Sequence, residues 1–235
     1  MSGEMQRLYE HIYGGFDAPI SAFDCGKKCA PYNERGVPFC CDTQHAVPAV
    51  YDDEWAYLQA NTDLWHAWQP DNPLEFERVR AETPDHMTLV ACQGHTLCQR
   101  GFRSVACRAF PFFPYLTSEH EFIGLTYYWE YESACWVISN LDQVSDSYIQ
   151  QFVNTFDRIF ALKPEERQSY GRQSLNMSRV FARAGRSIPL LHREGGVYKL
   201  SARTGRMRQI SPEHLPKYGP YEIARQLPFP DEIAG

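Results

Sequence analysis

The sequence predicts an α+β fold with an irregular cysteine-rich core, short helices, a small antiparallel sheet, and a C-terminal helix followed by a hairpin. Three observations support this class. Residues 16–50 are rich in Gly, Pro and Cys and show no sustained apolar period. Apolar residues recur at helical spacing over residues 145–162. Two stretches rich in β-branched and aromatic residues are bounded by turn residues, as strands of an antiparallel sheet are.

Short elements are expected in the first half of the chain. Residues 4–13 favour a helix, and residues 73–80 favour another with Pro73 in its first turn. Between them, Asp52 or Asp53 caps a helix that reaches Asn61. Residues 88–91 form a short strand that leads into Cys92.

The second half contains the strongest periodic signals. Residues 121–131 predict a strand that pairs with residues 110–116 across the polar turn 117–120. Ser145 or Asp146 caps a helix that ends at Lys163-Pro164. Its apolar stripe is expected to be core: Ile149, Phe152, Val153, Phe156, Ile159 and Phe160.

The C-terminal region predicts a helix over residues 175–184 and a hairpin over 189–200 with Gly195-Gly196 at its turn. A second turn at Thr204-Gly205 adds a third strand, and an irregular wrap follows from Pro212. We expect a cysteine-cluster domain over residues 1–163 and a basic extension over 164–235, packed on the same domain.

The charge distribution is uneven. Residues 167–208 contain ten Lys or Arg and one acid, a net charge of +9, in a chain whose total is −6. This block could bind nucleic acid or phosphate, or dock on the acidic body of its own molecule. We favour docking because no aromatic-basic recognition motif accompanies the block. A protein partner is a further candidate.

The N-terminus shows no signal peptide, and no window approaches 18 consecutive apolar residues. We therefore expect a cytoplasmic protein without a membrane partner.

Seven of the eight cysteines fall into two clusters, and in a reducing compartment clustered thiols hold metal more often than they form disulfides. Cys25 and Cys29 stand at i, i+4 spacing, which on a helical turn suits two ligands of one centre. Cys40 and Cys41 are adjacent, so they need an unusual turn to reach one centre, or each serves a different one. The core is thus expected to be organised by metal.

The second cluster is Cys92-x5-Cys98-x8-Cys107, which is loose for a zinc ribbon but acceptable for an iron–sulfur cluster. Four thiolates complete one zinc site or one four-iron cluster, and eight would suffice for two, so both counts stay open. His45 and His95 are alternative ligands, although polar loop positions explain them better. The candidate metal ligands are Cys25, Cys29, Cys40, Cys41, Cys92, Cys98, Cys107 and Cys135.

Two arginines flank Cys107, and cationic neighbours stabilise a thiolate. Arg103 and Arg108 are therefore candidate cofactor-binding residues that could donate hydrogen bonds to sulfur. Pairing with the acidic body explains them equally well. Cys135, beside Trp136, also fits an ordinary buried cysteine.

The stretch from Cys98 to Pro111 resembles the hallmark of the CxxCxxCC cysteine-cluster (YkgJ-like) family, described as a zinc- or iron-chelating domain. The resemblance covers about residues 20–140. Ser104 stands where the family has proline, and the first cysteine group is stretched, which leaves open whether its four thiolates meet at one centre. The matching residues are Cys25, Cys29, Cys40, Cys41, Cys92, Cys98, Arg103, Cys107, Arg108, Phe110 and Pro111, with Cys135 where many members carry a further cysteine.

The leading hypothesis is a metal-binding protein that holds an iron–sulfur cluster, for example 4Fe-4S, or zinc. One alternative is an enzyme similar to the flagellin lysine N-methylases, which carry this type of cysteine cluster. Against it, the chain contains no Gly-x-Gly-x-x-Gly loop after a strand. Another alternative is thiol redox chemistry, with a strained vicinal disulfide between Cys40 and Cys41.

Overall fold

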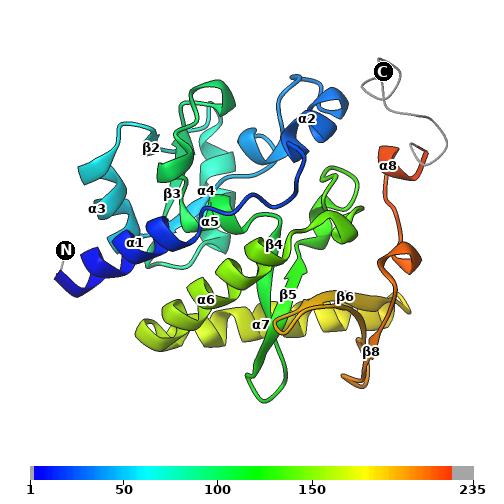
Figure 1. The fold of residues 1–235 in the computed structure, drawn as a ribbon. Helices are drawn as coiled ribbons and strands as arrows, with labels where there is room; N and C mark the ends of the chain where they lie inside the picture. The colour runs from blue at the N-terminus through cyan, green and yellow to red at the C-terminus, as the bar shows by residue number, and fades with distance from the viewer. Residues whose placement is uncertain (1–2, 224–235) are drawn as a thin grey trace. The chain divides into compact units, whose positions relative to one another are not determined.

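The computed structural model describes residues 3–223 (Figure 1). The α+β class is confirmed: within these residues helices combine with two antiparallel sheets, one of three strands and one of five. The chain divides into two compact units. Unit 1 contains residues 3–17 and 33–110, and unit 2 contains residues 18–32 and 111–223. The predicted domain boundary between residues 163 and 164 lies inside unit 2, at the junction of two helices.

Unit 1 is a three-stranded sheet with helices, and the elements predicted for it are present. The sheet has the order β1–β3–β2, and β3 is the predicted strand at 88–91 extended at both ends. Its elements are α1 (Gly3–Gly15), β1 (Ala49–Tyr51), α3 (Asp52–Asn61), β2 (Trp65–Ala67), α4 (Pro73–Glu82), β3 (Met87–Cys92) and α5 (Val105–Ala109).

Helix α4 begins at Pro73 because Asn72 caps it, accepting a hydrogen bond from the Leu74 amide at 3.1 Å. Phe76 and Val79 of this helix pack on a small core formed by Trp68, Leu89 and Ala91. The sheet of unit 1 is therefore held by apolar burial against α4 as well as by its strand pairing.

Helices α1 and α3 meet through tyrosines and carboxylates. The Tyr9 hydroxyl donates to Asp53 and the Tyr13 hydroxyl to Glu54, both at 2.7 Å. The predicted cap of α3 at Asp52 or Asp53 is wrong, because the N-cap residue is Tyr51 and both aspartates lie in the first turn. In the first turn, the negative charges of these aspartates still interact favourably with the helix dipole.

Unit 2 is built on the five-stranded sheet, ordered β4–β5–β6–β7–β8. The predicted hairpin strands join the predicted strand pair in this one sheet, since β5 pairs with β6 through Gly124 opposite His192 and Leu125 opposite Leu191. Its elements are α2 (Cys25–Cys29), β4 (Phe112–Leu116), β5 (Phe122–Tyr127), α6 (Asp146–Leu162), α7 (Pro164–Arg183), β6 (Ser187–His192), β7 (Val197–Ser201), β8 (Met207–Gln209) and α8 (Pro220–Ile223).

The backbone of β6 approaches β5 so closely at Gly124 that a larger residue has no room. A Cβ added at Gly124 would lie 2.2 Å from the Leu191 carbonyl oxygen. Glycine therefore allows the two halves of the sheet to join at this position.

Helices α6 and α7 are separated by one residue. Ser145 caps α6 as predicted, and the whole predicted apolar stripe of this helix is buried. Lys163 leaves the helical region because Pro164 follows it, and Pro164 then starts α7. The helix predicted at 175–184 is thus the second half of a longer one.

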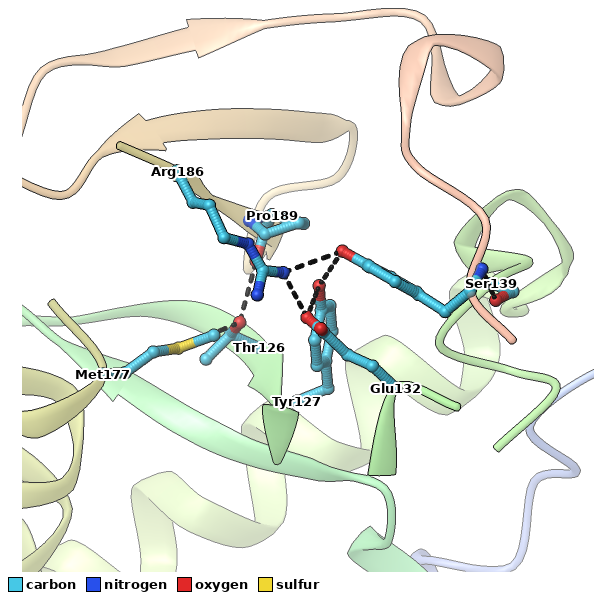
Figure 2. A network of polar contacts seen from close by, with 8 residues as sticks. Thr126, Tyr127, Glu132, Ser139, Met177, Arg186 and Pro189 are labelled. Atoms are coloured by element: carbon cyan, nitrogen blue, oxygen red, sulfur yellow. Dashed lines mark hydrogen bonds and ion pairs between the residues drawn. The ribbon is translucent and has the colours of Figure 1, made fainter. Parts of the chain in front are cut away.

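The segment 211–222 runs along unit 2 as the irregular wrap that the sequence predicted, apart from short turns at Pro212–His214 and α8. The Tyr218 hydroxyl lies 3.0 Å from both the Tyr127 hydroxyl and Arg186 Nη2, and Arg186 pairs with Glu132. Figure 2 shows Arg186 and Glu132 pointing toward one another beside Tyr127. The part of the predicted wrap beyond residue 223 lies outside the described residues.

Candidate metal centre

The two units divide the eight cysteines. Unit 1 contains Cys40, Cys41, Cys92, Cys98 and Cys107, and unit 2 contains Cys25, Cys29 and Cys135. The first cysteine group of the sequence is therefore split between the units. All eight lie within the described residues, and no disulfide joins any two of them.

The end of strand β3 carries Cys92, opposite Trp65 of β2. The Trp65 indole donates to the Phe102 carbonyl at 2.8 Å, which holds the loop after Cys98 against β2. Gln99 strengthens this attachment, because it accepts from the Thr62 hydroxyl at 2.7 Å. These contacts bring the loop of Cys98 to the end of the strand that bears Cys92.

The adjacent pair lies in a 3₁₀ turn, Phe39–Cys41. The sulfurs of Cys40 and Cys41 are 4.0 Å apart. A disulfide requires about 2.05 Å, so the pair is not oxidised to a vicinal disulfide. The residue that follows this turn is the buried Asp42, which forms an ion pair with Arg35 at 2.9 Å.

The short helix α5 carries Cys107, and Ser104 caps it by accepting from the Cys107 amide at 3.2 Å. Burial raises the pKa of the Cys107 thiol to about 12, against the opposing effect of Arg103. The next largest influences on the pKa of Cys107 come from Cys41, Cys98 and Cys92, and each of them raises it.

The pKa of the Cys92 thiol is raised first by burial and then, among other effects, by Cys41 and Cys98. Cys41 and Cys98 therefore act electrostatically on both Cys92 and Cys107. We call Cys41, Cys92, Cys98 and Cys107 the four-thiol group.

The two predicted arginines have different surroundings. Arg103 acts electrostatically on Cys107, and its buried Nε has no hydrogen-bond partner among the described residues. Arg108 is 2% exposed and donates to the backbone carbonyls of Arg103 and Gly101, both at 2.7 Å, and to that of Phe16. Arg103 is therefore the arginine with a spare donor near the thiols, whereas Arg108 supports the loop that carries it.

The two histidines occupy different turns of unit 1. The His45 ring packs edge-on against Phe39, with 4.8 Å between the ring centroids. His95 is exposed in the 3₁₀ turn His95–Leu97. Both are exposed turn residues, the interpretation that the sequence favoured over ligation.

The thiols of unit 2 come from two distant stretches. Cys25 and Cys29 are the first and last residues of α2, whose N-cap Asp24 accepts from the Gly26 amide at 3.1 Å. Cys135 is buried, and burial, followed by the neighbouring Cys25, raises the pKa of its thiol; Cys29 raises it too. The cysteine that stood alone in the sequence is thus influenced electrostatically by two others, and we call Cys25, Cys29 and Cys135 the three-thiol group.

Sequence reasoning missed two residues that support these groups. Buried Glu54 accepts from the Val105 amide at 2.7 Å, at the start of the helix that carries Cys107. Tyr221 donates to the Ala134 carbonyl at 2.8 Å, beside Cys135. A glutamate in the first turn of a helix and a tyrosine in a Pro-rich tail carry no local signal of such roles.

Within residues 3–223, no group of three or more His, Cys, Asp or Glu side chains is arranged so that it could hold a metal ion. Coordination would therefore require the cysteine side chains to turn about χ1, a bond with three staggered positions. Among the helices described, none is both long and apolar enough to cross a membrane.

No family model, curated protein or solved structure matches the chain. The resemblance to the cysteine-cluster family therefore stays a prediction.

Proposed function

We propose that the protein holds an iron–sulfur cluster or a zinc ion through Cys41, Cys92, Cys98 and Cys107. The observation that carries the proposal is the four-thiol group itself, in which thiols from three separate stretches of unit 1 act electrostatically on Cys92 and Cys107. Four thiolates are a complete ligand set for tetrahedral zinc or for one four-iron cluster.

The surroundings of Cys107 support a charged centre. Arg103 favours the thiolate form of Cys107, against the burial that favours the thiol. The buried Arg103 Nε, without a hydrogen-bond partner among the residues described, would cost about 1–3 kcal/mol as an unsatisfied donor. A sulfur atom of a bound centre would supply the acceptor, and hydrogen bonds to sulfur tune such centres.

The donor set also narrows the choice of metal. Thiolates are soft ligands that select zinc, iron–sulfur clusters or Cu(I) over Mg²⁺ and Ca²⁺. Such a centre needs reduced cysteines, which a reducing compartment such as the cytoplasm provides.

The test is elemental analysis with visible absorption spectra on untagged protein purified without oxygen. The wild type should contain brown iron–sulfur chromophore or colourless bound zinc. Cys98→Ser should lose about four irons with their sulfide, or about one zinc, because one of four ligands is gone.

Cys40→Ser is the matched control. Its sulfur lies 4.0 Å from that of Cys41, but Cys41 is the member of the pair that raises the pKa of both Cys92 and Cys107. We expect this variant to keep its metal. Equal metal contents in the wild type and Cys98→Ser would refute the proposal.

A further inference from the structure

We infer that unit 2 binds the sugar-phosphate backbone of double-stranded nucleic acid, without regard to base sequence, through a surface of exposed arginines. We call Arg179, Arg183, Arg203 and Arg206 the arginine group. This surface lies in unit 2 and shares no residue with the proposed metal centre of unit 1, so it adds a second activity to that function.

Ion pairs within the molecule use only part of the basic block that the sequence shows at residues 167–208. Arg186 forms one such pair with Glu132. Arg193 forms another with Asp157, at 2.8 Å. All members of the arginine group are exposed, and none of them forms an ion pair with a described carboxylate. Pairing with acids of the same molecule, the interpretation favoured from the sequence, therefore accounts for two of the ten basic residues.

Two segments bring the arginine group together at one end of unit 2. Arg179 and Arg183 stand at i, i+4 spacing, so they lie on the same face of α7, and Arg183 is the last residue of this helix. Arg203, in the turn between β7 and β8, donates to the carbonyl of Ala182 at 3.4 Å. The turn therefore lies beside the end of α7 that carries the other two arginines.

The turn that carries Arg203 and Arg206 has a backbone held by hydrogen bonds. The Ser201 amide donates to the Arg206 carbonyl, and the Gly205 amide donates to the Ser201 carbonyl, both at 2.9 Å. The Thr204 amide donates to the Ser201 hydroxyl at 3.3 Å. Gly205 has a φ of +69°, which glycine adopts without strain. A ligand of this turn would need to order only the arginine side chains, which limits the entropy that binding costs.

Like charges stand next to one another in this part of unit 2. Arg179 and Arg183 repel at their i, i+4 spacing, although the helix dipole favours a cation at Arg183. On the edge strand β8 (Figure 1), Arg208 lies directly opposite Lys199 of β7, and like charges in this position destabilise a sheet. An anionic partner would offset both repulsions.

The composition of the surface favours a duplex over a single strand. All members of the arginine group carry a planar guanidinium, which can donate two parallel hydrogen bonds to one phosphate. Within residues 167–208 the exposed large apolar side chains are Leu175, Val180 and Met207, and none of these is aromatic. The bases of a single strand would therefore find no ring to stack on. A duplex offers the denser array of phosphates and needs no stacking.

An anionic membrane fits this surface less well. Peripheral membrane binding requires apolar side chains that enter the lipid boundary. Met207, next to Arg206, lies directly opposite Leu200 in the strand pair, so its side chain is on the side of the sheet that buries Leu200. The arginine group thus lacks an outward-pointing apolar anchor from this strand.

The test is fluorescence anisotropy of a labelled random-sequence DNA duplex of about 20 base pairs, titrated with the full-length protein at several salt concentrations. One phosphate contact for each member of the arginine group predicts that wild-type affinity falls about 100-fold as salt rises from about 50 to 200 mM. Arg203→Gln/Arg206→Gln should bind more weakly at low salt. Its affinity should fall only about tenfold over the same range, because two contacts remain.

Arg78→Gln/Arg158→Gln is the matched control. It removes two exposed arginines outside residues 167–208 and changes the net charge by the same amount. We expect it to keep the wild-type affinity and the wild-type salt dependence. The four substituted positions are exposed, so both double variants should fold, and circular dichroism checks that they do.

Three results would overturn the inference. The first is a wild type that does not bind the duplex at about 50 mM salt. The second is an equal loss of affinity in both double variants, which would reduce the effect to net charge. The third is binding, through Arg203 and Arg206, of another probe at least as tightly as the duplex: a single strand of the same length, vesicles that contain phosphatidylserine, or polyglutamate as a substitute for an acidic protein.

Discussion

Replacing Glu54 with glutamine tests how the interior of unit 1 supports the candidate site. The Glu54 side chain is 1% exposed and accepts hydrogen bonds from the Tyr13 hydroxyl and the Val105 amide, both at 2.7 Å. Val105 opens the helix that carries Cys107. Glutamine keeps the shape and one carbonyl acceptor but cannot titrate.

The magnitude follows from the pKa of Glu54. Burial raises it from 4.5 to about 7, although the hydrogen bonds from Val105 and Tyr13 oppose the rise. The folded protein therefore binds this proton more tightly than the unfolded chain does. The resulting stabilisation is fully present below pH 4.5 and is lost as the pH rises through 7. The rise of this pKa from 4.5 to about 7 corresponds to roughly 3 kcal/mol.

The assay is urea unfolding of metal-free protein, with reductant and chelator, at pH 4.5 and pH 8. As the pH rises from 4.5 to 8, the free energy of unfolding of Glu54→Gln should increase by about 3 kcal/mol relative to that of the wild type. Tyr13→Phe, which removes a hydrogen bond that lowers the Glu54 pKa, should instead enlarge the pH dependence. A difference between Glu54→Gln and wild type that is the same at both pH values would refute the reasoning.

Three further predictions concern the supports of the two units and the metal. Arg108→Met should lower the free energy of unfolding of metal-free protein by about 3 kcal/mol or more in urea titrations, because buried carbonyls lose their donor. Arg103→Met removes a buried donor that has no hydrogen-bond partner among the described residues, so it should not lower this free energy yet should weaken metal binding. Equal losses of stability in the two variants would contradict the assignment. Gly124→Ala should cost about 3 kcal/mol in thermal unfolding because its Cβ would meet the Leu191 carbonyl, and an unchanged melting temperature would argue against the strand approach. Metal affinity, measured by competition with a chelator, should fall by up to about tenfold per ligating thiol for each unit by which the pH is lowered. The reason is that thiols such as Cys107, with a pKa of about 12, must lose a proton to bind metal. A metal affinity that does not change from pH 8 to pH 6 would exclude thiolate ligation.

Much of the fold could be read from local sequence. The stripe of α6, the turn glycines of the β6–β7 hairpin and the apolar runs of β4 and β5 predict their own elements, because periodicity and turn chemistry act over a few residues. Strands β1 and β2 were not predicted because each has only three residues, too few to show an alternation of apolar and polar side chains. Each is formed by pairing with β3. The joining of the hairpin to β5 at Gly124 likewise depends on partners far along the chain.

For the candidate site, the sequence by itself determined the donor chemistry: eight cysteines, their clustering, and arginines beside Cys107. Only the tertiary structure decided the grouping, which assigns Cys29 and Cys40 to different units and assigns Cys29 and Cys135 to the same unit, although more than a hundred residues of chain lie between them. Spacing along the chain governs which thiols share a helical turn. Which thiols come near one another depends instead on long-range packing, here through contacts such as that of Tyr221 with Tyr32 and Ala134.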